Sequence, residues 1–296
     1  MTTVVTPPPA QPVQRPPHCD ALPESALADA LAPASASAGD ESGLRLDKRT
    51  HLDQQAQLDR SYYRIILRNY GPGLSEIGWS FIPVAVSAKS GRGLSEQREM
   101  HEDRAIRRAR SRIRQLILTT GADHLLTLTY RENITDFDLS CTHLSKFIRI
   151  VKNKMPGWVY VAVAEQQQRG AWHWHLAVRG RQDVDTLRAS WRHVVGDGNI
   201  DVKPPSNRTQ NRQLALVRYL GKYLAKGFKE GTRELNARRF RASRGIEVPA
   251  EYLTLPLVHK DNVRLFIEGK LVANAGTVGY VWQAEGKLAG WACSWK

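Results

Sequence analysis

Two histidines lie two residues apart in the stretch His173-Trp174-His175. The apolar residues around them indicate a β-strand, in which alternate side chains point to opposite faces. Both imidazoles would then lie on one face, with Trp174 on the other. Two imidazoles on one face can bind a single divalent ion. Histidine pairs of this kind are also common on ordinary protein surfaces, so the pattern by itself does not establish a metal site.

A carboxylate adds to this pair. Glu165 stands eight residues before His173, at the end of an apolar run, and the QQQRG segment between them contains a glycine suited to a tight turn. A hairpin here would bring the carboxylate beside the imidazoles. Two histidines and one carboxylate can hold Mg²⁺ or Mn²⁺ for Lewis-acid chemistry on a phosphate. The same donor set also suits non-haem iron or zinc, and an isolated hairpin glutamate is often simply solvated.

A second group of reactive side chains lies downstream, in two tandem Tyr-x-x-Lys units formed by Tyr219, Lys222, Tyr223 and Lys226. Residues four apart share one face of a helix, so the tyrosines lie one turn apart and the lysines repeat that spacing. A tyrosine hydroxyl becomes a useful nucleophile when a metal polarises its target and a cation stabilises the developing charge. The alternative is an amphipathic helix with core tyrosines and solvent-facing lysines.

The elements that would position these residues can be predicted from periodicity. Alternating, β-rich runs predict strands at residues 124–130, 158–164, 172–179 and 198–203. Helical spacing of apolar residues predicts helices at residues 139–154, 184–195 and 211–228. This order indicates an α+β fold with an antiparallel sheet flanked by helices, of split βαβ type.

Composition divides the chain into four predicted parts. Residues 1–44 form a Pro- and Ala-rich tail that we expect to be disordered. Residues 45–121 form an accessory segment that contains a basic helix at about residues 95–119, and residues 122–228 form the core. Residues 229–296 form a C-terminal extension with a terminal hairpin that turns at Glu285-Gly286-Lys287.

The charge favours a polyanionic partner. The formal net charge is +14, and residues 1–44 hold one basic and five acidic residues, so the rest of the chain carries +18. Such an excess suits nucleic acid, although a solubility charge or a membrane-facing surface is an alternative. The basic helix is expected to contact DNA phosphates through Arg104, Arg107, Arg108, Arg110, Arg112 and Arg114.

The three cysteines are far apart and form no CxxC pair, so neither a zinc finger nor a disulfide framework is expected. A reducing cytoplasmic compartment is the simplest fit. No apolar stretch is long enough to span a bilayer, and the N-terminus does not resemble a secretory signal. We therefore expect a protein of the cytoplasm without a membrane partner.

Taken together, the His-x-His strand, the acid ahead of it and the downstream Tyr-x-x-Lys helix resemble the HUH endonuclease superfamily over roughly residues 122–228. The tandem tyrosines in YLGKYLAK are similar to its paired-tyrosine branch of rolling-circle replication initiators, which includes the gene A replication proteins of small single-stranded DNA phages. Residues 124–130 match the first motif of that superfamily. The tyrosine helix follows the histidines, as in replication initiators, whereas in conjugative relaxases it precedes them.

This resemblance implies a reaction and its residues. His173, His175 and Glu165 would hold Mg²⁺ or Mn²⁺, with the glutamate less secure because the third ligand varies in the family. Tyr219 or Tyr223 would attack single-stranded origin DNA, keep the 5′-phosphate as a phosphotyrosine and free a 3′-OH. Lys222 and Lys226 would assist at the phosphate.

The resemblance also implies partners. The free 3′-OH would prime a host polymerase in a bacterial cell. The chain contains no GxxxxGK[ST] phosphate loop, so a host helicase would open the duplex. Three other classes remain open at this point: a single-tyrosine transposase of the same superfamily, a non-catalytic basic DNA-binding protein, and an iron or zinc enzyme acting on a small molecule.

Overall fold

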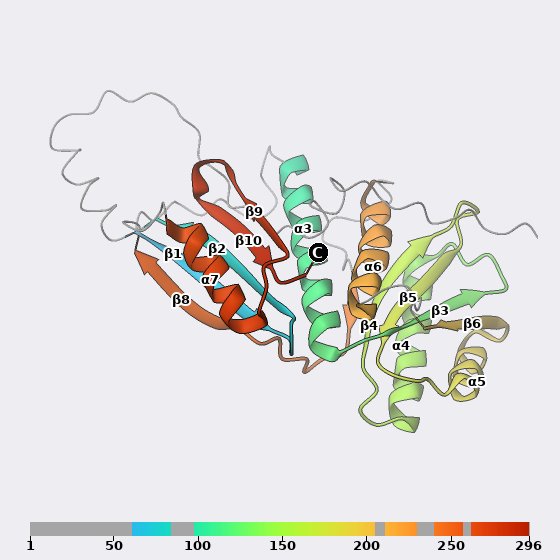
Figure 1. Cartoon of the computed structure of the whole chain (residues 1–296). Coiled ribbons are helices and arrows are strands. Elements are labelled where there is room, and N and C mark those ends of the chain that lie inside the picture. Colours follow the sequence, from blue (N-terminus) through green and yellow to red (C-terminus); the bar gives the residue numbers. More distant parts are fainter. Residues whose placement is uncertain (1–60, 84–97, 205–210, 230–239, 257–261, 296) are drawn as a thin grey trace, which may run out of the picture.

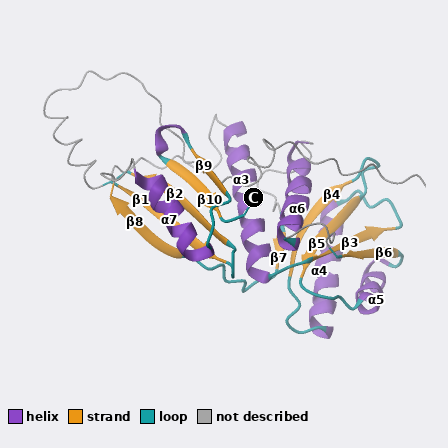
Figure 2. Ribbon diagram, viewed as in Figure 1, coloured by secondary structure: helices purple, strands orange, loops and turns teal. Residues whose placement is uncertain are grey.

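The computed structural model describes residues 61–83, 98–204, 211–229, 240–256 and 262–295. The predicted disordered tail, residues 1–44, lies outside the described residues. The described part contains two five-stranded sheets and five α-helices, and none of these helices combines the length and apolar character needed to cross a bilayer (Figure 2).

One sheet carries the predicted core. Its strands are β3 (His124–Tyr130), β4 (Tyr160–Gln166), β5 (Trp172–Val178), β6 (Gly198–Lys203) and the two-residue β7 (Arg241–Ala242). They lie in the order β6-β3-β5-β4-β7, and every pair is antiparallel. Strand β5 lies between β3 and β4, which are joined through a helix. The predicted α+β class and split βαβ arrangement are confirmed.

Helices cover both faces of this sheet (Figure 1). Helices α4 (Phe137–Lys154) and α5 (Val184–Val195) pack on one face, where Trp174 and Leu176 of β5 point. Helices α3 (Arg98–Thr120) and α6 (Arg212–Lys229) pack on the other, against Val163 and Ala177. Because side chains alternate along each strand, the even-numbered residues of β5 face α4 and the odd-numbered ones, including both histidines, face α6.

The second sheet combines strands from both ends of the described chain. Its order is β8 (Glu251–Pro256), β1 (Tyr62–Asn69), β2 (Ser75–Ile82), β10 (Ala289–Cys293) and β9 (Tyr280–Gln283). Strands β9 and β10 reverse at residues 285–287, as expected. Helix α7 (Val263–Ala275) packs on one face through Val263, Ile267 and Leu271. Helix α3 lies between the two sheets (Figure 1).

A buried ion pair joins this second sheet to α3. Glu76 and Arg114 are each only 1% exposed, and Nε of Arg114 lies 2.8 Å from Oε2 of Glu76. The Glu76 carboxylate also accepts hydrogen bonds from the hydroxyl of Tyr70 at 2.7 Å and the indole of Trp291 at 3.1 Å. Burial, followed by the Glu76 charge, raises the pKa of Tyr70, so its hydroxyl stays protonated as the donor.

The prediction that Arg114 contacts DNA is wrong, because this side chain is buried and its guanidinium stacks over the Trp291 ring, 4.5 Å from the ring centroid. The other arginines of α3 differ in exposure. Arg108 and Arg112 are exposed, whereas Arg104, Arg107 and Arg110 are half-buried. Their contact with phosphates stays a prediction.

A close approach of backbone and ring supports one stability prediction. A Cβ added at Gly290 would lie 1.9 Å from Cζ2 of Trp79, a buried side chain that is 3% exposed. We expect Gly290→Ala to lower the free energy of unfolding by about 1–3 kcal/mol or more, because the indole must move within a packed core. Urea denaturation measures this loss.

The matched control is Gly78→Ala on the neighbouring strand, where a Cβ would meet no atom of the described chain within 4 Å. It should change stability by only a few tenths of a kcal/mol. Equal effects of the two substitutions would show that the contact between Gly290 and Trp79 is not tight.

Candidate active site

The hairpin of β4 and β5 brings Glu165 and the histidines together. Glu165 and His173 are paired positions in the antiparallel register, so their side chains leave the sheet on the same face. His175 lies on that face two residues further, and Trp174 points into the opposite core. His173 is 7% exposed and His175 4% exposed, so neither is an ordinary surface histidine.

Both ring nitrogens of His175 have partners. Nε2 lies 2.8 Å from Oε2 of Glu165, and Nδ1 lies 3.2 Å from the hydroxyl oxygen of Thr127. Thr127 is the residue of β3 that pairs with His175 in the sheet register. Sequence reasoning placed this threonine in a strand motif but gave it no role; the available signal was its position in a strand expected to pair beside β5.

His173 lies in a different environment. Its Nδ1 is 3.2 Å from Nε2 of Gln167, while its Nε2 is buried and has no hydrogen-bond partner among the described residues. Burial, and then the charge of His175, lowers the pKa of His173 to about 4. The imidazole is therefore neutral at physiological pH, which is the form that binds metals. Gln167, a loop residue without an evident role in the sequence, orients this ring.

Helix α6 places both tyrosines against His175. The Tyr223 ring stacks on the imidazole with centroids 4.3 Å apart and planes 19° apart. The Tyr219 ring meets the same imidazole edge-on at 5.6 Å. The two hydroxyl oxygens are 3.1 Å apart, within hydrogen-bond distance. Each tyrosine is partly buried, so α6 presents a pair of phenols to the histidine face of the sheet.

The two lysines of α6 are placed differently. Nζ of Lys226 lies 3.1 Å from Oε1 of Glu165 and 3.2 Å from the carbonyl oxygen of Gln166. Lys222 is exposed, and no hydrogen bond or ion pair joins it to this cluster within the described ranges. Burial raises the pKa of Glu165, but hydrogen bonds from His175 and Lys226 outweigh it and hold the pKa below its usual value. The carboxylate is ionised at neutral pH.

The donor types suit a divalent ion. Two imidazoles and one carboxylate converge on one face, and the buried Nε2 of His173 lacks a partner there. In the described arrangement, however, the Glu165 carboxylate is engaged by His175 and Lys226. Among the residues that the structure describes, no group of three or more His, Cys, Asp or Glu side chains is positioned to hold a metal. Metal binding by this trio thus stays a prediction.

Comparison with known proteins identifies the same region. Residues 123–228 match the family model of the replication-associated protein ORF2. Neither the curated proteins nor the solved structures contain a significant match. The matched stretch begins at β3 and ends in α6, so it includes the hairpin acid, both histidines and both tyrosines. Over residues 123–228 the chain therefore carries a replication-associated domain of the ORF2 type, which supports its assignment as a rolling-circle Rep-like replication initiator.

Proposed function

We propose that this protein nicks single-stranded origin DNA by attack of a tyrosine on a phosphodiester, with Mg²⁺ or Mn²⁺ as cofactor. The tyrosine oxygen bonds to phosphorus as the bond between phosphorus and the 3′ oxygen breaks. The phenol proton passes to a nearby base, and the departing 3′ oxygen gains a proton to become a free 3′-OH. The 5′-phosphate stays on the tyrosine until a 3′-OH attacks it and rejoins the strand.

The observation that carries this proposal is the position of α6 over the histidine face. Tyr223 stacks on His175 and Tyr219 lies within hydrogen-bond distance of Tyr223. A structural amphipathic helix would need tyrosines on its buried face, but it would not need them against a buried histidine that is paired with a carboxylate. The replication-associated family match over the same residues supports the same reaction class.

Each residue of the site then has a defined task. His173, His175 and Glu165 would hold the divalent ion, which when bound supplies Lewis-acid activation of the scissile phosphate. Thr127 and Gln167 orient the two imidazoles through their other ring nitrogens. Lys226 is the cation closest to this group in the described chain, so it is the better candidate than Lys222 to stabilise charge at the phosphate.

Two tyrosines permit a cycle of two cuts. The first tyrosine holds the 5′ end while a host polymerase extends the 3′-OH and a host helicase opens the duplex. After one round, the second tyrosine cuts the regenerated origin, and the new 3′-OH displaces the first tyrosine. The 3.1 Å separation of the hydroxyls supports this sharing, since both phenols lie close to the same histidine.

The direct test uses a labelled library of single-stranded oligonucleotides, incubated with the protein and Mg²⁺ or Mn²⁺, or with chelator. A denaturation-resistant adduct that needs metal and maps to Tyr219 or Tyr223 supports the proposal. DNA binding without an adduct on any sequence would instead indicate a non-catalytic DNA-binding protein. An adduct that persists in chelator would remove the metal from the mechanism.

Replacement of a histidine gives a sharper prediction. His175→Ala should reduce adduct formation by about 10³-fold or more, because it removes a predicted metal ligand and the partner of Glu165 and Tyr223. Adduct yield is measured over a range of Mn²⁺ concentrations, with circular dichroism as the check on folding. The matched control is His193→Ala, an exposed histidine of α5 that should nick normally. Normal adduct yield in His175→Ala would rule out this ligand assignment.

A further inference from the structure

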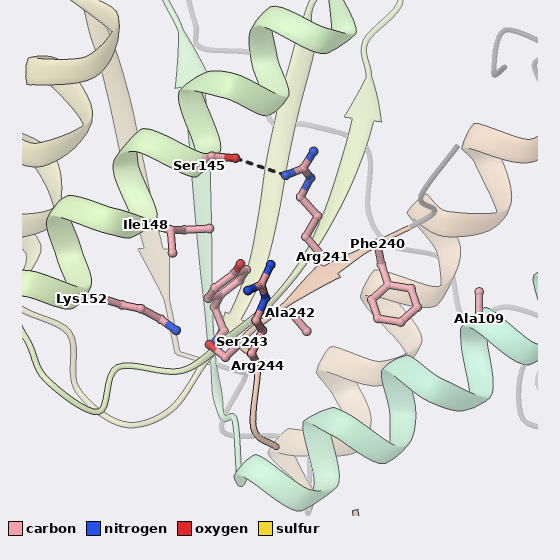
Figure 3. A pocket seen from close by; sticks show the side chains of 10 residues that line it. Ala109, Ser145, Ile148, Lys152, Phe240, Arg241, Ala242, Ser243 and Arg244 are labelled. Atoms are coloured by element: carbon pink, nitrogen blue, oxygen red, sulfur yellow. Dashed lines mark hydrogen bonds between the residues drawn. The ribbon is translucent and has the colours of Figure 1, made fainter. Parts of the chain in front are cut away.

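A basic hollow lies away from the candidate active site, between α4 and the edge strand β7. It has a volume of about 650 Å³. Its cations are Lys152 of α4, Arg241 of β7 and Arg244 just beyond it, and Figure 3 shows all three side chains around one opening. The apolar part of its lining includes the rings of Tyr160 and Phe240. No acidic residue lines this hollow among the described residues.

A second hollow, of about 530 Å³, adjoins the first and shares Ser145 and Arg241 with it. It adds the exposed cations Lys146 and Arg149 of α4, with Asp138 as its one acid in the described chain. We call the two hollows together the basic groove. Its five cations form no ion pair with any described acid, so their charges are available to a ligand. The groove is longer than a single phosphate needs, which favours a polymeric anion.

Local contacts hold the floor and one cation of this groove in place. Nη1 of Arg241 donates to Oγ of Ser145 at 3.2 Å, drawn as a dashed line in Figure 3. Ser243 fixes β7 to β4, because its backbone N–H donates to the Tyr160 carbonyl and its hydroxyl accepts from the Tyr160 N–H. Arg244 is exposed beside them. The groove is therefore a defined surface with a basic wall and an aromatic floor.

Strand β4 connects the groove to the candidate active site. Tyr160 begins this strand and lines the groove, whereas Glu165 lies five residues further along. At about 3.3 Å per residue, the two ends are roughly 17 Å apart. Their side chains also face opposite sides of the sheet. A mononucleotide cannot reach both places, but a strand of several nucleotides can, since one DNA strand advances about 3.4 Å per base.

We propose that the basic groove binds the backbone of the single-stranded DNA that continues beyond the nick. Unpaired cations with aromatic rings beneath them are the features by which proteins hold single strands without reading sequence. The proposal rests on the proposed function for the identity of this DNA. The groove would anchor the flanking strand while the tyrosines act on the scissile phosphate at the other end of β4.

The test compares the wild-type chain with the triple variant Lys152→Gln, Arg241→Gln, Arg244→Gln. Fluorescence anisotropy measures the affinity for a long oligonucleotide that spans both places and for a short one of about six nucleotides centred on the nick site. Each lost phosphate contact lowers the salt slope for single strands by about 0.7, so the long oligonucleotide should lose about two units of slope. If the proteins bind alike at ~1 M salt, this predicts about a hundredfold weaker binding at ~0.1 M.

The short oligonucleotide separates this inference from the proposed function. Its binding and its adduct yield at saturation should be unchanged in the triple variant, because no substituted residue belongs to the tyrosine site. A matched control, Arg188→Gln, Arg264→Gln, Lys270→Gln, removes three other surface cations and should keep the wild-type slope for the long oligonucleotide. An unchanged slope in the groove variant, or an equal loss for short and long DNA, overturns the inference. Absence of any adduct in the wild type overturns only the proposed function.

Discussion

Replacing both Tyr219 and Tyr223 with phenylalanine is expected to reduce the covalent protein–DNA adduct by about 10³-fold or more while DNA affinity stays close to that of the wild type. The substitution removes only two hydroxyl oxygens, and the rings can still pack on His175 at their present distances. Folding and DNA contact should therefore survive, whereas no phenol remains to attack phosphorus. Adduct yield on denaturing gels and affinity by anisotropy measure the two effects separately.

Single substitutions then distinguish the roles of the two phenols. Each of Tyr219→Phe and Tyr223→Phe should keep some adduct formation on the remaining tyrosine but lose the second cut that ends a replication round. Tyr252→Phe, a tyrosine that is 67% exposed, serves as the control and should behave as the wild type. An adduct that survives in the double variant would place the nucleophile elsewhere in the chain.

The second large effect is expected in stability. Arg114→Met should lower the free energy of unfolding by about 3–5 kcal/mol, because it leaves the Glu76 carboxylate buried without its cation. The Tyr70 and Trp291 hydrogen bonds would remain, but neither carries a compensating positive charge. Urea denaturation followed by circular dichroism measures the loss.

Two companion variants test the cause. Arg112→Met removes an exposed arginine of the same helix and should change stability by less than about 0.5 kcal/mol. Arg114→Met combined with Glu76→Gln removes both charges and should recover part of the loss, since the buried amide needs no counterion. A loss in Arg114→Met no larger than that in Arg112→Met would contradict the burial of this ion pair.

Local patterns predicted the core elements and the site residues well, for a physical reason. Strand alternation and helical spacing depend on neighbouring residues, so β3, β6 and α5 were predicted with the bounds that the structure has. The hairpin of Glu165 and His173 follows from a short glycine turn, which allows few registers. The tyrosine spacing on α6 likewise placed both rings on one face.

The second sheet could not be predicted in this way. Strand β1 pairs with β2 and with β8, whose residues lie far apart in the chain, and β10 pairs with β2 from the other end. Such pairing depends on complementary buried faces across long sequence separations, which no local period encodes. The exposed-looking strand β8 and helix α7 carry weak apolar patterns because each buries only one side against the sheet.

By itself, the sequence determined the α+β core, the His-x-His and Tyr-x-x-Lys residues and the resemblance to replication initiators, because these depend on residue type and short spacing. Only the tertiary structure decided which similar residues do different things. Lys226 and Lys222 share one spacing, but the docking of α6 on β4 brings only Lys226 to Glu165. Arg114 belongs to the same basic run as Arg112, but the packing of α3 on the second sheet buries it on Glu76. Charge and periodicity describe a helix face, whereas the partner that covers the face is set by packing.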